Sequence, residues 1–253
     1  MIQAHAATDA GPVRPVNEDA FLIDQELGLY AVADGIGGHN AGEVASRLAL
    51  DALAAFVRRS ATDTDLSWPY GVLAELSYGA NRLRTGIHLA NRRVFRAAES
   101  QDDYTGMGTT MVAVLIDGGL RAAIANVGDS RIYLWRAGEV TRLTVDDSWV
   151  EALRAQGLSA DELARHPMRH VLTNVVGARD KVDVHVRELA LEPGDRLLLC
   201  SDGVHEPLDE AGIARLLGNG SAESAAAELV RAALDRGGRD NATAVVLEAG
   251  APA

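Results

Sequence analysis

The segment GLYAVADGIGGHNAGE, residues 28–43, holds the pattern from which the fold and a site can be predicted. Residues 29–33 form a short apolar run that predicts a buried strand, and Asp34 follows this run directly. A carboxylate at the end of a buried strand loses its hydration, which is costly unless a cation or several hydrogen-bond donors replace the water. We therefore expect Asp34 to be held by a polar partner.

The same arrangement of an apolar strand and an aspartate recurs along the chain. LLLCSDG places Asp202 after a second apolar run, AIANVGDS places Asp129 just past a strand, and GGRDNATAVV places Asp240 just before one. If neighbouring strands are antiparallel, these aspartates can converge at one edge of a sheet. A single Asp-Gly is chiefly a turn or cap signal, so the indication rests on the recurrence. Four converging carboxylates repel one another and favour divalent cations between them.

Helical and strand patterns along the rest of the chain predict the fold class. Two long helices are expected, at residues 40–60 and after Pro69, whereas TTMVAVLID, LRAAIANVGDS and RIYLWRAGEVTRLT are typical of strands joined by glycine turns. The run MVAVLI is apolar without alternation, so its sheet should be covered on both faces. After the strand DRLLLCSDG, residues 209–236 look helical, and NATAVVLEA is a closing strand.

Grouped helices and grouped hairpins together favour an α+β fold, a four-layer sandwich of two antiparallel sheets between helix layers. No repeat or linker divides the chain, so we expect a single domain over residues 1–253. The stripe of the first helix that is expected to face the core is Val44, Leu48, Ala52 and Phe56.

Composition disfavours several classes of protein. The 253 residues are 47% hydrophobic, enough for a large core, and the net charge of −12 disfavours a duplex nucleic-acid binder, which needs clustered Lys and Arg. No apolar stretch approaches the roughly 20 residues that span a bilayer, and MIQAHAATDAG lacks the regions of a signal peptide. Cys200, the one cysteine, is expected to be a small core residue. We expect a cytoplasmic monomer without membrane insertion.

Oxygen ligands alone favour Mg²⁺ or Mn²⁺, and the alternative sites lack residues that they need. Zinc would use His166 and His170, but Pro167 lies between them and no third nitrogen or sulfur ligand is near. The calcium-loop pattern D-x-[DN]-x-[DN]-G is absent, as is the G-x-G-x-x-G of dinucleotide binders. A phosphatase of the haloacid dehalogenase type needs a second aspartate two positions after the first, where this chain has Ile36.

Six motifs occur in the order seen in one family: RPVNEDA (14–20), ADGIGGHNAGE (33–43), GMGTT (106–110), NVGDSR (126–131), LCSDG (199–203) and RDNATAVV (239–246). The chain resembles bacterial metal-dependent protein serine/threonine phosphatases of the PPM (PP2C-type) family. The resemblance implies an α/β/β/α sandwich, two Mn²⁺ or Mg²⁺ ions at one edge, and hydrolysis of phosphoserine and phosphothreonine in proteins. A water shared by two cations ~3.5–4 Å apart loses a proton readily and attacks phosphorus in line, so no covalent phosphoenzyme is needed.

The resemblance also implies roles for individual metal ligands. Asp34 should bridge the two core ions, and the backbone carbonyl of Gly35 should add a ligand, because only glycine lets the backbone approach so closely. Asp202 and Asp240 should complete the protein ligands of the first ion. Asp129, together with Asp202, matches a third and weaker metal site of bacterial members.

The resemblance also implies roles for residues around these ions. Glu18 and Asp19 should act through metal-bound waters, and Arg14 resembles the arginine that binds the substrate phosphate. The alternative for Arg14 is an ion pair with a nearby acid. Some eukaryotic relatives have a proposed general-acid histidine where this chain has Ile36. Protonation of the leaving group is therefore left open between a metal-bound water and His39.

Residues 145–182 resemble the family's flap, a mobile segment beside the catalytic cleft; the alternative is an ordinary helical crossover. The implied partners are phosphoproteins, especially serine/threonine kinases and their substrates, whose signalling the enzyme would reverse. The alternative function is a catalytically weak phosphoprotein-binding regulatory module of the same fold. Such a module usually lacks a metal ligand, and none of the expected ligands is missing from this sequence.

Overall fold

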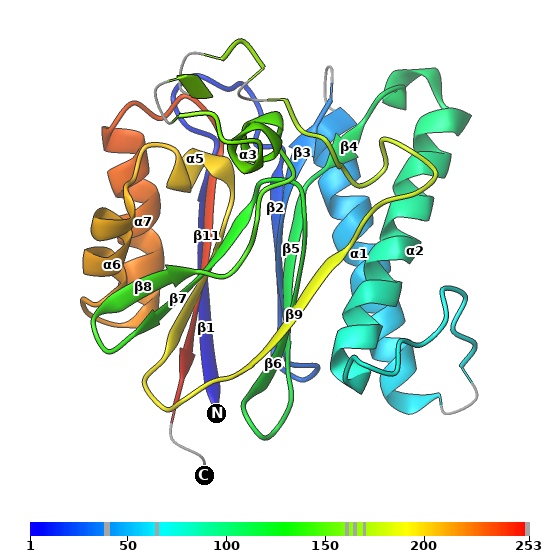
Figure 1. Ribbon diagram of the computed structural model, residues 1–253, viewed down its shortest axis with the longest axis horizontal. Helices are drawn as coiled ribbons and strands as arrows, with labels where there is room; N and C mark the ends of the chain where they lie inside the picture. The colour runs from blue at the N-terminus through cyan, green and yellow to red at the C-terminus, as the bar shows by residue number, and fades with distance from the viewer. Residues whose placement is uncertain (38–40, 64–65, 160–161, 164–165, 169–170, 251–253) are drawn as a thin grey trace.

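The computed structural model describes residues 1–37, 41–63, 66–159, 162–163, 166–168 and 171–250. Two antiparallel β-sheets pack face to face in the middle of the molecule (Figure 1). The first sheet has the strand order β1 (Ile2–Asp9), β11 (Ala242–Ala249), β10 (Arg196–Cys200), β7 (Arg131–Arg136) and β8 (Glu139–Arg142). The second has the order β2 (Asp19–Asp24), β3 (Leu29–Ile36), β5 (Met111–Ile116), β6 (Arg121–Val127) and β9 (His185–Ala190), and the short β4 (Gly108–Thr109) pairs with the end of β3.

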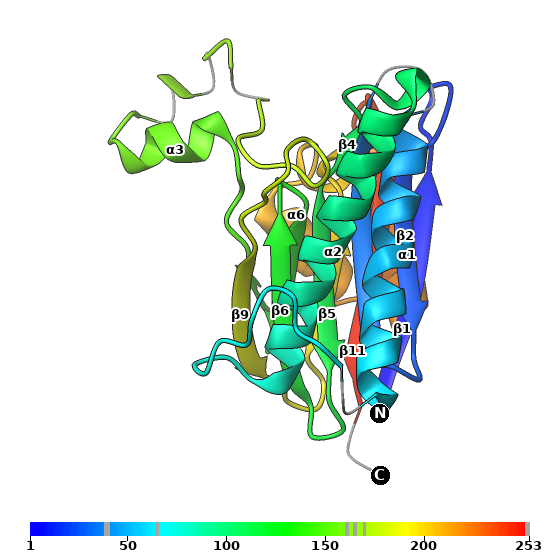
Figure 2. The ribbon, with the colours of Figure 1, turned by 90° about the vertical axis from the view of Figure 1, so that its right-hand side faces the viewer.

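Helices cover the outer face of each sheet, which confirms the four-layer sandwich (Figure 1). The second sheet is covered by α1 (Ala41–Thr62) and α2 (Tyr78–Ser100), and the first by α5 (Asp202–His205), α6 (Glu210–Leu217) and α7 (Ala222–Asp235). The 3₁₀ helix η1 (Asp102–Tyr104) follows α2, and α3 (Trp149–Ala155) projects sideways from the sandwich in Figure 2. Within the described residues, no helix is long and apolar enough to cross a membrane.

Three apolar clusters fill the spaces between the four layers. Alternate residues of β5 contribute to two of them: Met111 and Ala113 pack beneath α1 and α2, whereas Val112 and Val114 pack between the sheets. Every residue of β5 is buried, which confirms that MVAVLI belongs to a sheet covered on both faces. Cys200 is a buried core residue in the third cluster, between the first sheet and its helices, as predicted.

The helical pattern predicted over residues 209–236 is confirmed as two helices, α6 and α7. Ser221 caps the start of α7 by accepting a hydrogen bond from the backbone N–H of Ser224. Gly220 just before it has a φ of +62°, which the αR conformation of a continuous helix excludes. In α1, the predicted stripe packs in or against the core, and the fully buried face beside it consists of Ala45, Ala49, Leu53 and Val57. Alanines on this face let the helix lie close to the sheet.

Strands β1 and β2 are not predicted from the sequence, because both lack a clear apolar pattern. β1 is an edge strand in which only Ala4 is buried, and yet it pairs with β11 along its whole length. β2 is the edge strand of the second sheet, and its register places Asp19 directly opposite Asp34 of β3. The loop between β1 and β2 therefore ends beside Asp34.

Candidate metal centre and active site

The four predicted aspartates line one cleft of about 420 Å³ at an end of the sandwich. Asp34 belongs to β3, and Asp129 lies in the turn between β6 and β7. Asp202 begins α5 directly after β10, and Asp240 precedes β11. The antiparallel pairing of the strands brings these positions together, as the sequence predicts. The other predicted residues that line this cleft are Arg14, Glu18 and Gly35. We call Glu18, Asp19, Asp34, Asp129, Asp202 and Asp240 the acidic centre.

Asp19 lies in the interior beside the cleft and joins the two sheets. It is 9% exposed and stands opposite Asp34 in the β2–β3 pair. The Ser201 hydroxyl donates to Asp19 Oδ2 at 2.7 Å, and the backbone N–H of Thr243 donates to Ser201 Oγ at 3.0 Å. Ser201 and Thr243 belong to the first sheet's side of the sandwich, so this contact fixes Asp202, the next residue, relative to Asp34.

Several oxygens of the acidic centre are buried without a hydrogen-bond partner. Among the described residues these atoms include Glu18 Oε1, Asp19 Oδ1 and Asp202 Oδ1. A buried carboxylate oxygen with no partner is unfavourable, and oxygens of this kind are the ligands that Mg²⁺ and Mn²⁺ take up. In the part of the chain that the structure describes, no three His, Cys, Asp or Glu side chains form a ready-made cage around one point. Mg²⁺-type ions keep several of their own waters, so the fit rests on the unpartnered oxygens. The residues present therefore fit such ions.

Burial and neighbouring charges raise the pKa of several carboxyl groups of the acidic centre. Burial, followed by the charges of neighbouring aspartates, raises the pKa of Asp34 well above its usual value and that of Asp202 to about 6. Burial and the nearby acids likewise raise the pKa of Asp19 and of Asp129 to about 7. Cations among these acids would replace the protons that the raised pKa values favour.

Gly35 lets three segments of backbone meet beside Asp34. A Cβ atom at this position would lie 2.1 Å from the carbonyl oxygen of Gly42 and 2.6 Å from that of Glu18. The N–H of Gly35 donates to the same Glu18 carbonyl at 3.2 Å. No other residue fits between α1 and the start of β2, which is a reason for glycine that the sequence alone does not reveal.

Arg14 reaches the acidic centre from the loop between β1 and β2. Its Nη2 donates to Asp240 Oδ2 at 2.6 Å, so the ion pair that the sequence left as an alternative is formed. The two side chains are 48% and 36% exposed. An exposed pair of this kind contributes at most about 1 kcal/mol, so Arg14 can leave Asp240 for another anion at little cost.

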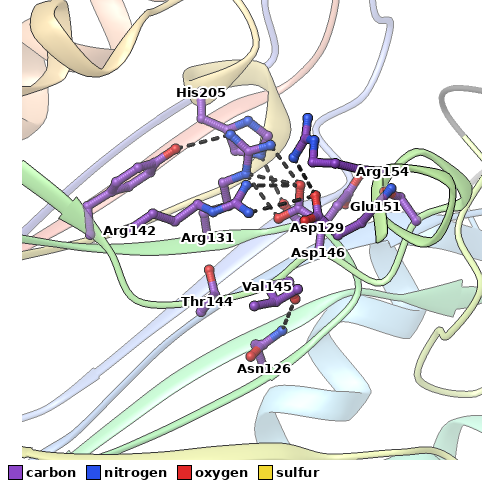
Figure 3. Close-up of polar contacts among 12 residues, drawn as sticks. Asn126, Asp129, Arg131, Arg142, Thr144, Val145, Asp146, Glu151, Arg154 and His205 are labelled. Atoms are coloured by element: carbon purple, nitrogen blue, oxygen red, sulfur yellow. Dashed lines mark hydrogen bonds and ion pairs between the residues drawn. The ribbon is translucent and has the colours of Figure 1, made fainter. Parts of the chain in front are cut away.

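A row of paired charges joins the flap segment, residues 145–182, to the sandwich (Figure 3). Arg131 donates to Asp146 through Nε at 3.0 Å and through Nη2 at 2.7 Å, and Arg142 Nη1 lies 3.5 Å from the same carboxylate. Glu151 of α3 lies 3.8 Å from Arg142 and 2.6 Å from Arg154. We call these five residues the flap base. The sequence does not predict it, because nothing in a single sequence selects which arginine meets which acid.

Asp147 joins the start of the flap segment to Asn174 later in the same segment, next to the acidic centre. Its Oδ2 accepts hydrogen bonds from the backbone N–H of Gly128 at 3.0 Å and from Asn174 Nδ2 at 2.7 Å. Its Oδ1 lies 2.7 Å from His185 Nε2 on β9. Since Gly128 precedes Asp129, Asp147 fixes these two parts of the segment to the turn that carries one of the predicted metal ligands.

His205, at the end of α5, contacts the same turn and was missed by the sequence analysis. Its Nε2 lies 2.9 Å from the backbone carbonyl oxygen of Asp129, and the residue is 7% exposed. Burial lowers the pKa of His205 to about 3, so the ring is neutral and Nε2 carries the proton that it donates to the carbonyl. The helix that begins with Asp202 therefore also positions Asp129.

Two histidines named from the sequence, His39 and His170, lie outside the described residues. His166 accepts a hydrogen bond at Nδ1 from the backbone N–H of Met168 at 3.3 Å. Ile36, at the position of the histidine in some eukaryotic relatives, lines the cleft and is 40% exposed. The group that faces the cleft at this position is therefore apolar.

Comparison with known proteins agrees with the sandwich and its acidic edge. The family model described as protein phosphatase 2C matches residues 14–236. The chain therefore belongs to the protein phosphatase 2C family, as the motifs indicate.

Individual relatives sharpen this assignment. The chain is 36% identical over 249 residues to "Serine/threonine protein phosphatase PstP" of Mycobacterium tuberculosis, covering 98% of this chain and 45% of the relative, so it spans less than half of that protein. It is 34% identical over 252 residues to "Serine/threonine phosphatase stp" of Listeria innocua, covering 98% and 96%. The crystal structure of the PstP catalytic domain in complex with two manganese ions superposes with a TM-score of 0.82 at 34% identity, covering 99% of each chain.

Proposed function

We propose that this protein hydrolyses phosphoserine and phosphothreonine in proteins with the help of two Mn²⁺ or Mg²⁺ ions. The observation that carries the proposal is the acidic centre, in which three buried carboxylate oxygens lack partners among the described residues and the pKa values of Asp34 and Asp129 are raised. Buried acids that are left unneutralised by the protein itself are typical of a functional site rather than of a structural ion pair. The names of the PstP and stp relatives support the same activity.

The acidic centre supplies the ligands for these ions. We assign Asp34 to both ions, with the Gly35 carbonyl, Asp202 and Asp240 as further ligands, and Asp129 with Asp202 to a third, weaker site. Two bound cations would lower the pKa of a water held near phosphorus and offset charge on the phosphoryl oxygens.

The acids next to these ligands have a supporting role in the proposal. Glu18 and Asp19 hold waters through their unpartnered oxygens, and the hydroxyl of Ser201 fixes the orientation of the Asp19 carboxylate.

Arg14 binds the substrate in this proposal. Its guanidinium is half-exposed at the mouth of the site and is already oriented by an anion, the Asp240 carboxylate. The planar guanidinium of Arg14 can bind two oxygens of a phosphate group, which also carries a larger charge than a carboxylate. Arg14 would therefore exchange one anion for the other. This exchange would also free Asp240 to bind a cation.

The physiological setting forms the outer part of the proposal. We infer that the substrates are phosphoproteins, in particular serine/threonine kinases and their targets, and that the protein acts in the cytoplasm as a monomer of one domain. Every acid that the metal chemistry needs is present, which favours hydrolysis over the alternative of a phosphoprotein-binding module.

A chelation assay tests the proposed function. Hydrolysis of p-nitrophenyl phosphate and of a phosphothreonine peptide should require millimolar Mn²⁺ or Mg²⁺, stop in EDTA, and return when the ion is restored in excess. Full turnover after exhaustive chelation would contradict the metal mechanism. Tight binding of the phosphopeptide without any hydrolysis in Mn²⁺ would instead support the binding module.

A further inference from the structure

One side of the cleft is apolar, although the other side is the acidic centre. Ile36 from the end of β3 and Leu172, Val175 and Ala178 from the flap segment line the cleft together with glycines. We call these four residues the apolar wall. The charged residues among the described lining belong either to the acidic centre or to Arg14.

The register of the strands makes the apolar wall continuous. Ile36 pairs with Gly108 of β4, and the neighbouring Thr109 forms a bridge with Val176 of the flap segment. A Cβ atom on Gly108 would lie 2.7 Å from Val175 Cγ1. Val175 therefore occupies the space that a side chain at position 108 would need, and this places it against the strand that pairs with Ile36.

Nothing in phosphate hydrolysis itself uses this wall. The phosphate group is recognised by Arg14 and by cations, and neither the attack nor the departure of the leaving group needs an aliphatic side chain. Ile36 is nevertheless 40% exposed at the cleft, and Leu172 and Val175 are only partly buried. Apolar surface that borders a charged site gains when an apolar group of the ligand displaces its water.

We propose that the apolar wall binds an aliphatic side chain adjacent to the phosphorylated residue. The preferred substrates are then phosphopeptides in which phosphoserine or phosphothreonine is flanked by residues such as leucine or valine. This inference rests on the proposed phosphatase function and names the substrate class of the same site. The phosphate anchors the peptide at the acidic centre, and the flanking side chain lies against residues 172–178 and Ile36.

The test compares two peptides that differ only beside the phosphothreonine, which is flanked by leucines in one and by asparagines in the other. Leucine and asparagine are close in size and both are uncharged, so the ratio of kcat/KM isolates the apolar contact. We expect the leucine peptide to be favoured about tenfold in Mn²⁺, the usual size of a partial aliphatic contact. A ratio also cancels any change in the amount of folded or metal-loaded enzyme.

Matched variants locate the contact. Val175→Thr keeps the shape of the side chain but adds a hydroxyl to the wall, and Leu172→Asn keeps the approximate size but places a polar carboxamide at a second position. Each should reduce the ratio to about threefold or less. The control is Val171→Thr, the same substitution in the same segment at a residue that is 39% exposed and does not line the cleft. The control should keep the wild-type ratio.

Each result decides whether the apolar wall binds the flanking side chain of the substrate. Equal hydrolysis of both peptides by the wild type overturns the inference and leaves the phosphatase function standing. A tenfold ratio that survives Val175→Thr and Leu172→Asn also overturns it, because the preference would then arise elsewhere. If neither peptide is hydrolysed by enzyme that is folded and loaded with Mn²⁺, the proposed function fails and the inference fails with it.

Discussion

The acidic centre and the flap base both bring acids together, but only the flap base neutralises its buried acid. In the acidic centre, Arg14 pairs with Asp240, which is 36% exposed, and the buried acids have no such partner among the described residues. In the flap base, Asp146 is 8% exposed and is matched by Arg131 and Arg142. In the acidic centre, Asp19 and Asp202 each keep a buried oxygen without a partner. The two regions lie beside each other in the fold, since the charge of Asp146 acts on Asp129.

This difference in pairing distinguishes the acid of the flap base, which stabilises the fold, from the acids of the acidic centre, which serve the site. Burial opposes the charge of Arg131, yet its hydrogen bonds with Asp146 raise the pKa of the guanidinium. Arg131 therefore stays ionised, and both oxygens of Asp146 accept hydrogen bonds from it. In the acidic centre, burial and repulsion raise the pKa of Asp34 instead, which leaves a demand for positive charge that the protein does not meet. A divalent cation meets that demand, whereas both oxygens of Asp146 in the flap base already accept hydrogen bonds from Arg131.

Removing one charge from the acidic centre should have the largest effect on activity. Asp34→Asn should lower kcat by at least about a thousandfold, because the amide removes the ligand assigned to both ions. Steady-state kinetics with a phosphopeptide and saturating Mn²⁺ measure it. The control is Asp103→Asn, an exposed acid of η1 away from the cleft, which should keep wild-type turnover. Near-normal kcat in Asp34→Asn would contradict the assignment of this residue.

The stability of the metal-free protein should depend on pH through the same acids. The pKa of Asp19 and of Asp129 is about 7 in the fold, against an ordinary value of 3.8, so the folded state binds more protons than the unfolded chain between these values. The contribution of these two acids to stability is then greatest below about pH 4 and falls as pH rises toward about 7, by on the order of a few kcal/mol.

Urea unfolding in EDTA across this pH range measures the effect. Excess Mn²⁺ should remove the loss, because an ion that binds only the folded state stabilises it by mass action. A metal-free stability that rises steadily from about pH 4 to about pH 7 would contradict the picture of uncompensated acids.

The sequence predicts the acidic centre well because each of its main residues is marked locally. Asp34 and Asp202 end strong apolar runs, so the strand pattern and antiparallel pairing are enough to bring them together. What joins them is not marked: Ser201 and Asp19 are 182 positions apart in the chain, and β2 has no clear pattern. The flap base is not marked locally either, because the sequence does not indicate which of several acids pairs with Arg131. Tertiary packing, rather than local propensity, decides these partners.

The last prediction compares how stability changes when one aspartate is neutralised in each of the two regions. In EDTA near neutral pH, Asp34→Asn should stabilise the fold, since it removes a carboxyl group whose pKa burial and repulsion raise. Asp146→Asn should instead destabilise it by about 2 kcal/mol, because Arg131 keeps its charge in the interior and loses its counter-ion. An opposing effect exists, since the charge of Asp146 adds to the raised pKa of Asp129.

That opposing effect should not turn the expected destabilisation by Asp146→Asn into a stabilisation. The pKa of Asp129 is raised first by burial and next by Asp202, with Asp146 after them, whereas Arg131 contacts Asp146 directly at 2.7 Å. Urea unfolding of both variants in EDTA decides the matter, with Glu192→Gln as the control for an exposed pair, here with Arg136, that is expected to change stability by less than about 1 kcal/mol. If Asp146→Asn also stabilised the metal-free protein, the acids of the flap base would belong to the acidic centre, and the distinction between a paired and an unpaired acid would not separate structure from function in this molecule.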